Sequence, residues 1–249
     1  MSHLIRPIAY AAVIAFFMMI LGGCATVADA RASPGQRLDP WESWNRKVFA
    51  FNEGLDKAVL KPVATGYTKV VPSFMRHGVD NFFANVADAW SAVNNVLQGK
   101  GEPAVSDVVR FTTNTVFGLL GVLDIASEFG LPHHHEDFGQ TLGAWGFGAG
   151  AYVVWPLLGP SSVRDSLALP VDHFASPTAW IGDGTLRIEV TALQAVNTRA
   201  RLLGAGQVID DASLDKYTFM RDAYLQRRRS LVFDGNPPDQ PDPSRPATP

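Results

Sequence analysis

The stretch from Phe138 to Val163 carries no charged side chain, and it constrains the fold more than any other part of the chain. It is long enough to cross a bilayer, for which about 20 apolar residues suffice. Glycine and proline are frequent in it, however, and both oppose a regular helix. These are Gly139, Gly143, Gly146, Gly148, Gly150, Gly159, Pro156 and Pro160.

Two interpretations of this segment remain open. It is either a buried, loop-rich part of the core, or a segment that lies in lipid, or against it, at shallow depth. Irregular backbone at membrane depth is tolerated only where protein covers it or where it lines a wet cavity. The second interpretation therefore predicts an opening nearby, and the tryptophans Trp41, Trp44, Trp145 and Trp155 favour it because Trp prefers membrane–water boundaries.

The N-terminus has the pattern of a bacterial export signal over residues 1–23. Arg6 supplies a positive charge, and the apolar run Ile8–Leu21 is too short to span a membrane. The sequence Leu-Gly-Gly-Cys at 21–24 is a lipobox, and Cys24 is the only cysteine. We expect Cys24 to carry a diacylglycerol and an N-acyl chain, such as palmitate; the alternative is a chance cysteine after an ordinary signal peptide. Ala25 follows it, where Asp would retain a lipoprotein in the inner membrane, so the outer membrane is the predicted location.

The rest of the chain divides into a flexible tether over 24–38, a helical domain over 39–232 and a disordered, proline-rich tail over 233–249. A single cysteine excludes an internal disulfide and a multi-cysteine metal site. The net charge is −3, with no dominant basic block, which disfavours nucleic acid as a partner.

Apolar residues spaced three and four apart predict a mainly α fold. The predicted helices cover 41–59, 72–97, a stretch from near Pro103 to Phe117, 188–203 and 214–231. Asp39-Pro40-Trp41-Glu42 is a helix start, Pro62 is expected to end or kink the first helix, and Gly99 closes the second. The first apolar face contains Trp41, Trp44, Val48, Phe51, Leu55 and Val59, and the second contains Met75, Val79, Phe82, Val86, Trp90, Val93 and Leu97.

No pattern of catalytic residues is present in the sequence. There is no Gly-x-Ser-x-Gly elbow and no phosphate-binding loop, and acylation of Cys24 would leave no free thiol. The chain is therefore not expected to be an enzyme, or to hold a cofactor other than its acyl chains. His133-His134-His135 is interpreted as a polar, pH-sensitive loop, because three adjacent histidines do not converge on a metal from a regular helix. A metal site is the alternative.

Several polar residues permit both a structural and a functional interpretation. Arg164-Asp165 is either a surface or locally paired ion pair, or a charged pair at a lipid headgroup or a pore mouth. Asn45 and Asn52 are either helix-flank residues or the polar lining of a channel. The run 227–229 of three arginines is either a solvated helix end or a docking site for an acidic partner.

Together these segments resemble the MlaA (VacJ) family of outer-membrane lipoproteins over about residues 38–232. The resemblance is carried by DPWESWNRKVFAFN (39–52), KPVATGY (61–67), RFTTNTVFGLLGVLDIA (110–126), DFGQTLGAWGFGAGAYVVWPLLGPSSVRD (137–165), NTRARLL (197–203) and YTFMRDAYLQRRR (217–229). The glycine-rich segment, with its closing Pro-x-x-Gly-Pro-Ser and Arg-Asp, is the most specific part.

The resemblance implies a ring of amphipathic helices in the periplasmic leaflet of the outer membrane, with an amphipathic channel through it. It implies that the protein removes phospholipid from the outer leaflet and passes it to a soluble periplasmic carrier, which maintains lipid asymmetry, and that it associates with a porin trimer. On this basis Asn45, Asn52, Arg164 and Asp165 are assigned to the lipid path, and Arg221, Arg227 and Arg228 to carrier docking. With no nucleotide site in the sequence, the path is expected to be passive.

Two other functions compete with transport. A structural or interaction lipoprotein that moves no lipid would have a closed core in which 138–163 is buried. A lipid hydrolase would need a nucleophile with a neighbouring base, and the sequence offers none in a recognised arrangement.

Overall fold

The computed structural model describes residues 38–238. The predicted export signal 1–23, Cys24 and all of the predicted tether except Leu38 lie outside the described residues, as do residues 239–249 of the predicted tail. The described part is mainly helical, as predicted, and contains one two-stranded antiparallel sheet.

The first helical stretch is longer than predicted and changes its winding near Pro62. α3 (Glu42–Leu55) passes into a π-helix, η2 (Asp56–Leu60), and then into α4 (Lys61–Val70). Pro62 lies in the first turn of α4, where a missing N–H has little cost. The N–H of Lys61 instead donates to the carbonyl of Asp56, five residues back. The proline thus marks a change of hydrogen-bond register, and the helical stretch continues beyond it.

The next two helices form an antiparallel pair and confirm the predicted boundaries to within a few residues. α5 covers Ser73–Leu97 and α6 covers Gly101–Val116. Gly99 joins them with a φ of 76°, a backbone conformation that glycine adopts without strain. A short helix, α7 (Ile125–Glu128), follows the turn at the end of α6.

The uncharged segment 138–163 forms several short elements. α8 covers Phe138–Ala144, and a glycine-rich loop leads to strands β1 (Tyr152–Trp155) and β2 (Gly159–Ser162). The strands pair antiparallel, with Tyr152 opposite Ser162 and Trp155 opposite Gly159. This hairpin was not predicted, because its strands are only four residues long. The segment is partly buried, as at Tyr152, and partly exposed, as at Trp155. The buried-core interpretation therefore holds for only part of it, and contact of the rest with lipid stays a prediction.

The remaining elements are α9 (Val163–Ala175), the 3-10 helix η3 (Pro177–Trp180), α10 (Gly184–Arg201), α11 (Leu203–Ala212) and α12 (Lys216–Val232). The positions of α10 and α12 agree with the predicted helices 188–203 and 214–231. Both begin after an aspartate, Asp183 or Asp215, whose carboxylate accepts from backbone N–H groups of the first turn.

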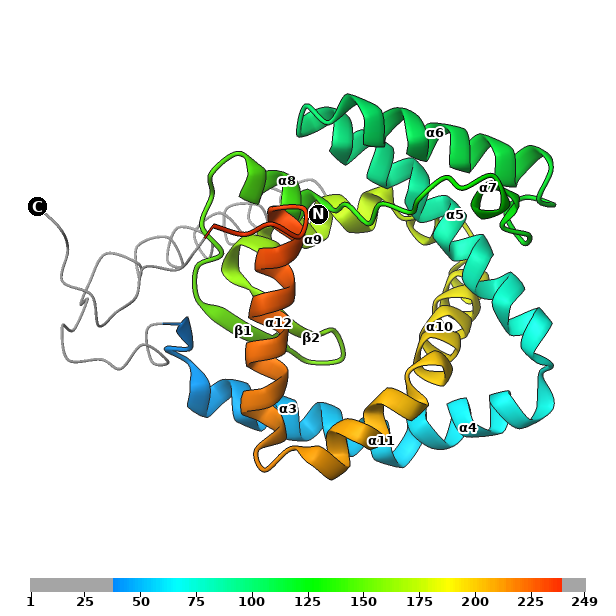
Figure 1. Cartoon of the computed structure of the whole chain (residues 1–249). Helices are drawn as coiled ribbons and strands as arrows, with labels where there is room; N and C mark the ends of the chain where they lie inside the picture. Colours follow the sequence, from blue (N-terminus) through cyan, green and yellow to red (C-terminus); the bar gives the residue numbers. More distant parts are fainter. Residues whose placement is uncertain (1–37, 239–249) are drawn as a thin grey trace, which may run out of the picture. The chain divides into compact units, whose positions relative to one another are not determined.

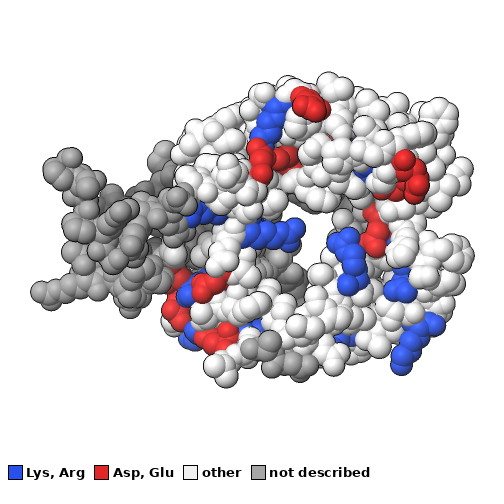
Figure 2. All heavy atoms as spheres, viewed as in Figure 1, with Lys and Arg blue, Asp and Glu red and all other residues white. Residues whose placement is uncertain are grey.

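These elements close into a ring within the described residues (Figure 1). α3, η2 and α4 follow one another, α4 packs on α10, and α10 packs on α5. α5 contacts α8, α8 contacts α12, α12 contacts β2, and β1 packs back on α3. The space-filling view is hollowed at the centre of this circuit (Figure 2). The predicted mainly α fold with a ring arrangement is therefore confirmed.

Candidate functional site: a polar ring with an apolar exterior

The distribution of polar and apolar side chains is inverted relative to a protein that folds in water. Arg110, Asn45 and Asp107 are fully buried, whereas the side chains of Phe174 and Trp180 are 68% and 78% exposed. Exposed large apolar residues far outnumber buried ones among the described residues, and buried polar residues outnumber buried apolar ones. Globular proteins in water rarely expose such large apolar areas, so this surface is suited to contact with lipid or another apolar partner.

The predicted apolar faces of the helices follow the same rule. The periodicity in the first and second helices is real, but Trp44, Phe51 and Met75 are more than half exposed. The buried residues of α5 are mostly small or polar, among them Asn85, Asp88, Ser91, Asn94 and Asn95. In Figure 2 most of the visible surface is uncharged, and the Lys, Arg, Asp and Glu side chains lie in small groups. Across residues 38–238, no helix combines the length and apolar character needed to cross a membrane.

Asn45 of α3 holds the hairpin in place. Its Nδ2 donates to the carboxylate of Asp39 at 2.8 Å and to the carbonyl of Tyr152 at 3.1 Å. Its Oδ1 accepts from the N–H of Val154 at 2.9 Å. The hydroxyl of Tyr217 donates to the other carboxylate oxygen of Asp39, which ties α12 to the same point. Asn45 thus satisfies backbone groups of β1 that have no neighbouring strand on this side.

Asn52, two turns further along α3, makes the equivalent contacts at the hairpin tip. Its Nδ2 donates to the carbonyl of Trp155, and its Oδ1 accepts from the N–H of Leu157, both at 2.9 Å. The two asparagines therefore act as a pair that fixes the hairpin on α3. These contacts account for their polarity without a channel, and the assignment of Asn45 and Asn52 to the lipid path stays a prediction.

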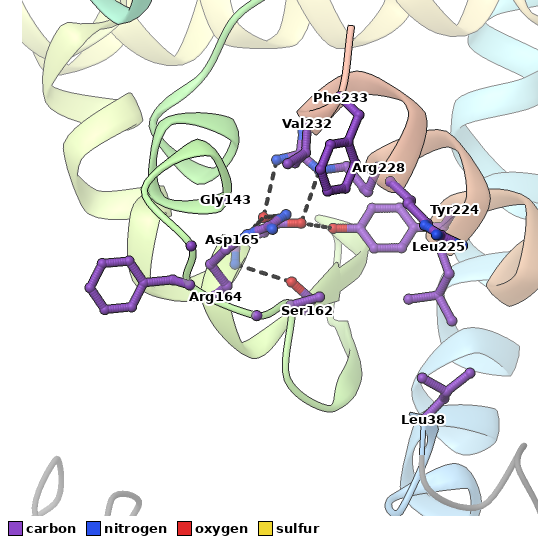
Figure 3. Close-up of a pocket in the computed structure, with 15 residues that line it drawn as sticks. Leu38, Gly143, Ser162, Arg164, Asp165, Tyr224, Leu225, Arg228, Val232 and Phe233 are labelled. Carbon is purple, nitrogen blue, oxygen red and sulfur yellow. Dashed lines mark hydrogen bonds and ion pairs between the residues drawn. The ribbon is translucent and has the colours of Figure 1, made fainter. Parts of the chain in front are cut away.

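Arg164 and Asp165 belong to a buried ion network (Figure 3). Arg164 donates from Nε and Nη2 to Asp165 Oδ1 at 2.9 and 2.8 Å. Arg228 of α12 donates from Nη2 to Asp165 at 3.0 Å and to Asp137 at 2.9 Å. The Tyr224 hydroxyl donates to Asp165 Oδ2 at 2.7 Å. The pair is locally paired, as one interpretation held, but it is buried rather than at the surface.

The network keeps its carboxylates ionised. Burial alone would raise the pKa of Asp165, but Arg228, the Tyr224 hydroxyl and Arg164 together bring it below its usual value. Burial likewise opposes ionisation of Asp137, and the hydrogen bonds from Arg228 outweigh it, so that the pKa of Asp137 is also lowered. The network therefore connects α8, α9 and α12 through hydrogen bonds between ionised side chains, which are stronger than hydrogen bonds between neutral groups. A role for Arg164 and Asp165 in the lipid path stays a prediction.

The three arginines assigned to carrier docking differ in accessibility. Arg221 is mostly buried and pairs with Asp222 at 2.9 Å and Asp39 at 3.5 Å. Arg228 is held in the ion network just described. Arg227 is exposed, so its side chain is the one of the three that a soluble partner could reach. The docking assignment stays a prediction for all three.

The histidine run is tied to α5 and α6. His133 Nδ1 lies 2.8 Å from Asp88 Oδ1, and His133 Nε2 lies 2.6 Å from Arg110 Nη2. Because a guanidinium only donates, Nε2 must accept, which assigns the neutral tautomer with the proton on Nδ1. His134 Nδ1 lies 2.7 Å from the buried Asp107. Among the described residues no group of three or more potential ligands is arranged to hold a metal ion.

The third histidine leads to a prediction about pH. The His135 ring stacks on His133, with centroids 5.4 Å apart and the planes 13° from parallel. Partial burial is the main reason that the pKa of His135 is lowered. A proton on the neighbouring His133 would act in the same direction, as do the charges of Arg227 and Arg201, whereas Asp88 opposes the shift. The unfolded chain therefore binds a proton more readily than the folded one. The contribution of neutral His135 to the free energy of unfolding is therefore fully present above about pH 6.5 and decreases as the pH falls below that value.

A thermal unfolding series between pH 7.5 and 5 tests this prediction. His135→Phe keeps an aromatic ring for stacking but removes the titrating group, so its melting temperature should fall less with acidification than that of the parent chain. His77→Phe, at an exposed position on α5, is the control and should follow the parent profile. Identical profiles for His135→Phe and the parent would reject the prediction.

Sequence reasoning missed the polar residues between α5 and α6. Asn95 Nδ2 donates to Asp107 at 2.8 Å, and Asn114 Nδ2 donates to Asp124 at 3.0 Å. Arg110 is fully buried between the two helices and pairs with Asp88. The signal was available, since Asp107, Arg110 and Asn114 are spaced three and four apart and form a polar stripe on one face of α6.

The comparisons with known proteins agree with one another. The family model described as MlaA lipoprotein matches residues 37–231. A protein of Rickettsia bellii is 34% identical over 195 residues, 78% of this chain and 76% of its own length. The intermembrane phospholipid transport system lipoprotein MlaA of Escherichia coli is 32% identical over 232 residues, 90% of this chain and 89% of its own.

A solved structure, described as the structural basis for maintenance of bacterial outer membrane lipid asymmetry, superposes with a TM-score of 0.70. It is 31% identical in sequence, and the match covers 78% of this chain and 98% of the other. Both the fold and the sequence motifs thus point to the same relatives. The chain belongs to the MlaA lipoprotein family.

Proposed function

We propose that this chain is an outer-membrane lipoprotein that transports phospholipid and maintains the lipid asymmetry of that membrane. The observation that carries the proposal is the closed ring with many exposed apolar side chains, polar side chains buried within its wall and a hollow centre. The names of the Escherichia coli relative and of the matching structure support it. An apolar rim can lie in hydrocarbon while the centre offers a polar route.

Physical chemistry explains why such a ring would be useful. A charged headgroup that enters hydrocarbon loses its hydration at a cost of several kcal/mol or more. A ring that is apolar outside and hollow inside removes this barrier, because acyl chains stay near apolar surface while the headgroup passes through the opening. Cationic side chains border the hollow on opposite sides, where they can attract a lipid phosphate (Figure 2).

The finer features of the proposal come from the sequence. Cys24 would carry the acyl chains that hold the ring at the periplasmic leaflet, since two or three chains anchor a protein durably. A porin trimer would contact part of the apolar rim, and a soluble periplasmic carrier would receive the lipid. The exposed Arg227 is the best placed of the proposed docking residues for that carrier. No catalytic step is part of the proposal.

Deleting the chain's gene from its own bacterium is expected to raise the phospholipid content of the outer leaflet several-fold, measured with a membrane-impermeant amine reagent. Re-expression of the parent chain should restore the low level. Re-expression of Cys24→Ser should not, because an unacylated chain would not be held at the membrane. A structural lipoprotein without transport activity predicts an unchanged outer-leaflet content in the deletion strain, and that result would contradict the proposal.

A further inference from the structure

The wall of the ring contains a separate cavity of about 350 Å³. The glycine-rich loop after α8 forms one side of it, and the last turns of α12 form the other (Figure 3). Apolar side chains supply most of the wall, namely Leu38, Phe147, Leu225, Val232 and Phe233. A cavity of this size lies near the lower end of the range for small-ligand sites, which is about 300–1,000 Å³. It suits one acyl chain better than two.

The polar end of this cavity carries an excess of positive charge. Arg164, Arg228 and Arg229 line it, and the carboxylates in contact with these guanidinium groups are Asp165 and Asp137. Among the described residues, three guanidinium groups therefore line the cavity and two carboxylates contact them, an excess of one positive charge. An anionic group that enters the cavity would be attracted to this end.

Arg164 provides the donor for such a group. Its side chain is 7% exposed, and its Nε and Nη2 donate to Asp165. No hydrogen bond joins its Nη1 to a described residue, and Arg164 lines a cavity whose wall is mostly apolar. A mostly buried guanidinium with spare N–H groups in such surroundings can donate to a carboxylate or phosphate oxygen in a charge-assisted hydrogen bond.

The glycines of the uncharged segment explain the shape of the cavity. A Cβ atom at Gly143 would lie 2.7 Å from Arg164 Nη1 and 2.8 Å from a methyl group of Val232. Any larger residue there would displace the guanidinium or the cavity wall. At Gly148 a Cβ atom would meet nothing within 4 Å, so the absence of a side chain leaves space at the rim. The glycine-rich composition thus keeps this part of the wall open.

We propose that this cavity binds an anionic lipid with a single acyl chain, its acid group on Arg164 and its chain along Phe147, Leu225 and Val232. The shared chemistry is an acid group on one hydrocarbon chain. Two sources are possible, a free fatty acid with a carboxylate and a lysophospholipid with a phosphate. The site lies in the ring wall and does not depend on transport through the central opening.

Photo-crosslinking tests the site. The full chain is placed in phosphatidylcholine nanodiscs with a palmitate analogue that carries a diazirine near the end of its chain, and labelled residues are identified by mass spectrometry. We expect labelling at the cavity wall on α12 and the glycine-rich loop. Unlabelled palmitate or lysophosphatidate should compete at least about tenfold better than hexadecanol, which lacks the charge. The stronger competitor of the two acids identifies the source.

Two variants and a control complete the test. Arg164→Gln should reduce labelling about tenfold or more, and Gly148→Leu, which places a side chain at the rim, should reduce it while leaving the ion network intact. Gly182→Leu is the matched control, because a Cβ atom there also meets nothing within 4 Å and the residue lies outside the cavity. If Arg164→Gln does not fold, Gly148→Leu and the competition series still test whether the cavity binds the lipid. Equal competition by hexadecanol, or unchanged labelling in Gly148→Leu, would overturn the proposal.

Discussion

Replacing Arg110 by methionine is expected to lower the free energy of unfolding by about 3–5 kcal/mol, the usual cost of breaking a buried ion pair by removing one partner. The guanidinium donates to Asp88 at 3.2 Å and to Asp124 at 2.9 Å, and it also meets the carbonyl of Leu131 and the ring of His133. Methionine fills similar volume but leaves the buried Asp88 without its cation. Chemical denaturation in detergent micelles, followed by circular dichroism, measures the loss.

The control for this prediction is Arg187→Met, at an exposed position on α10, which should change stability by less than about 0.5 kcal/mol. The combination of Arg110→Met with Asp88→Asn should be less destabilised than the two single effects added together, because it also removes the stranded charge. A loss below about 1 kcal/mol for Arg110→Met alone would show that the buried cluster does not hold α5, α6 and the histidine loop together.

Asn45→Leu is expected to destabilise the fold by about 2–4 kcal/mol, since each buried polar group left without a partner costs about 1–3 kcal/mol. Leucine has the same number of side-chain heavy atoms and the same branching as asparagine, so it changes the chemistry of the site more than the shape of the side chain. The N–H of Val154 and the carbonyl of Tyr152 lose their partner, and Asp39 loses a donor. Equilibrium unfolding followed by tryptophan fluorescence measures the change.

Asn52→Leu is the matched variant for this prediction. It removes the same chemical group from the same helix and frees the same kinds of backbone atoms, but at the more exposed hairpin tip. Water or lipid headgroups can replace the lost partners there, so the expected cost is about 1 kcal/mol or less. Equal losses for the two variants would show that burial of the hairpin contacts does not set their contribution.

The sequence predicts the helices well but not the direction in which they face. A spacing of three and four defines one side of a helix, and Met75 and Leu97 do lie on one side of α5. Periodicity cannot show whether that side meets a protein core or a hydrocarbon surround, because both are apolar. The deciding observation is the opposite side, where Asp88, Asn95 and their neighbours are buried.

The contacts that fix the site could not be predicted, because they join residues far apart in the chain. Asn45 meets a strand 107 residues later, and Arg228 meets Asp137, 91 residues earlier. A single sequence gives each residue type but not its partner. The place of Arg164 at the end of an uncharged segment makes it a candidate site residue, but the sequence does not predict that its side chain is buried.

The inverted polarity described above also affects the medium in which this chain is stable. In water the hydrophobic effect would favour turning Phe174, Trp180 and the exposed leucines inward, away from the surface they occupy in the ring. The ring is therefore expected to be more stable in lipid or detergent than in water. A chain released into water without lipid, detergent or another apolar cover is therefore expected to associate through these side chains or to lose the ring.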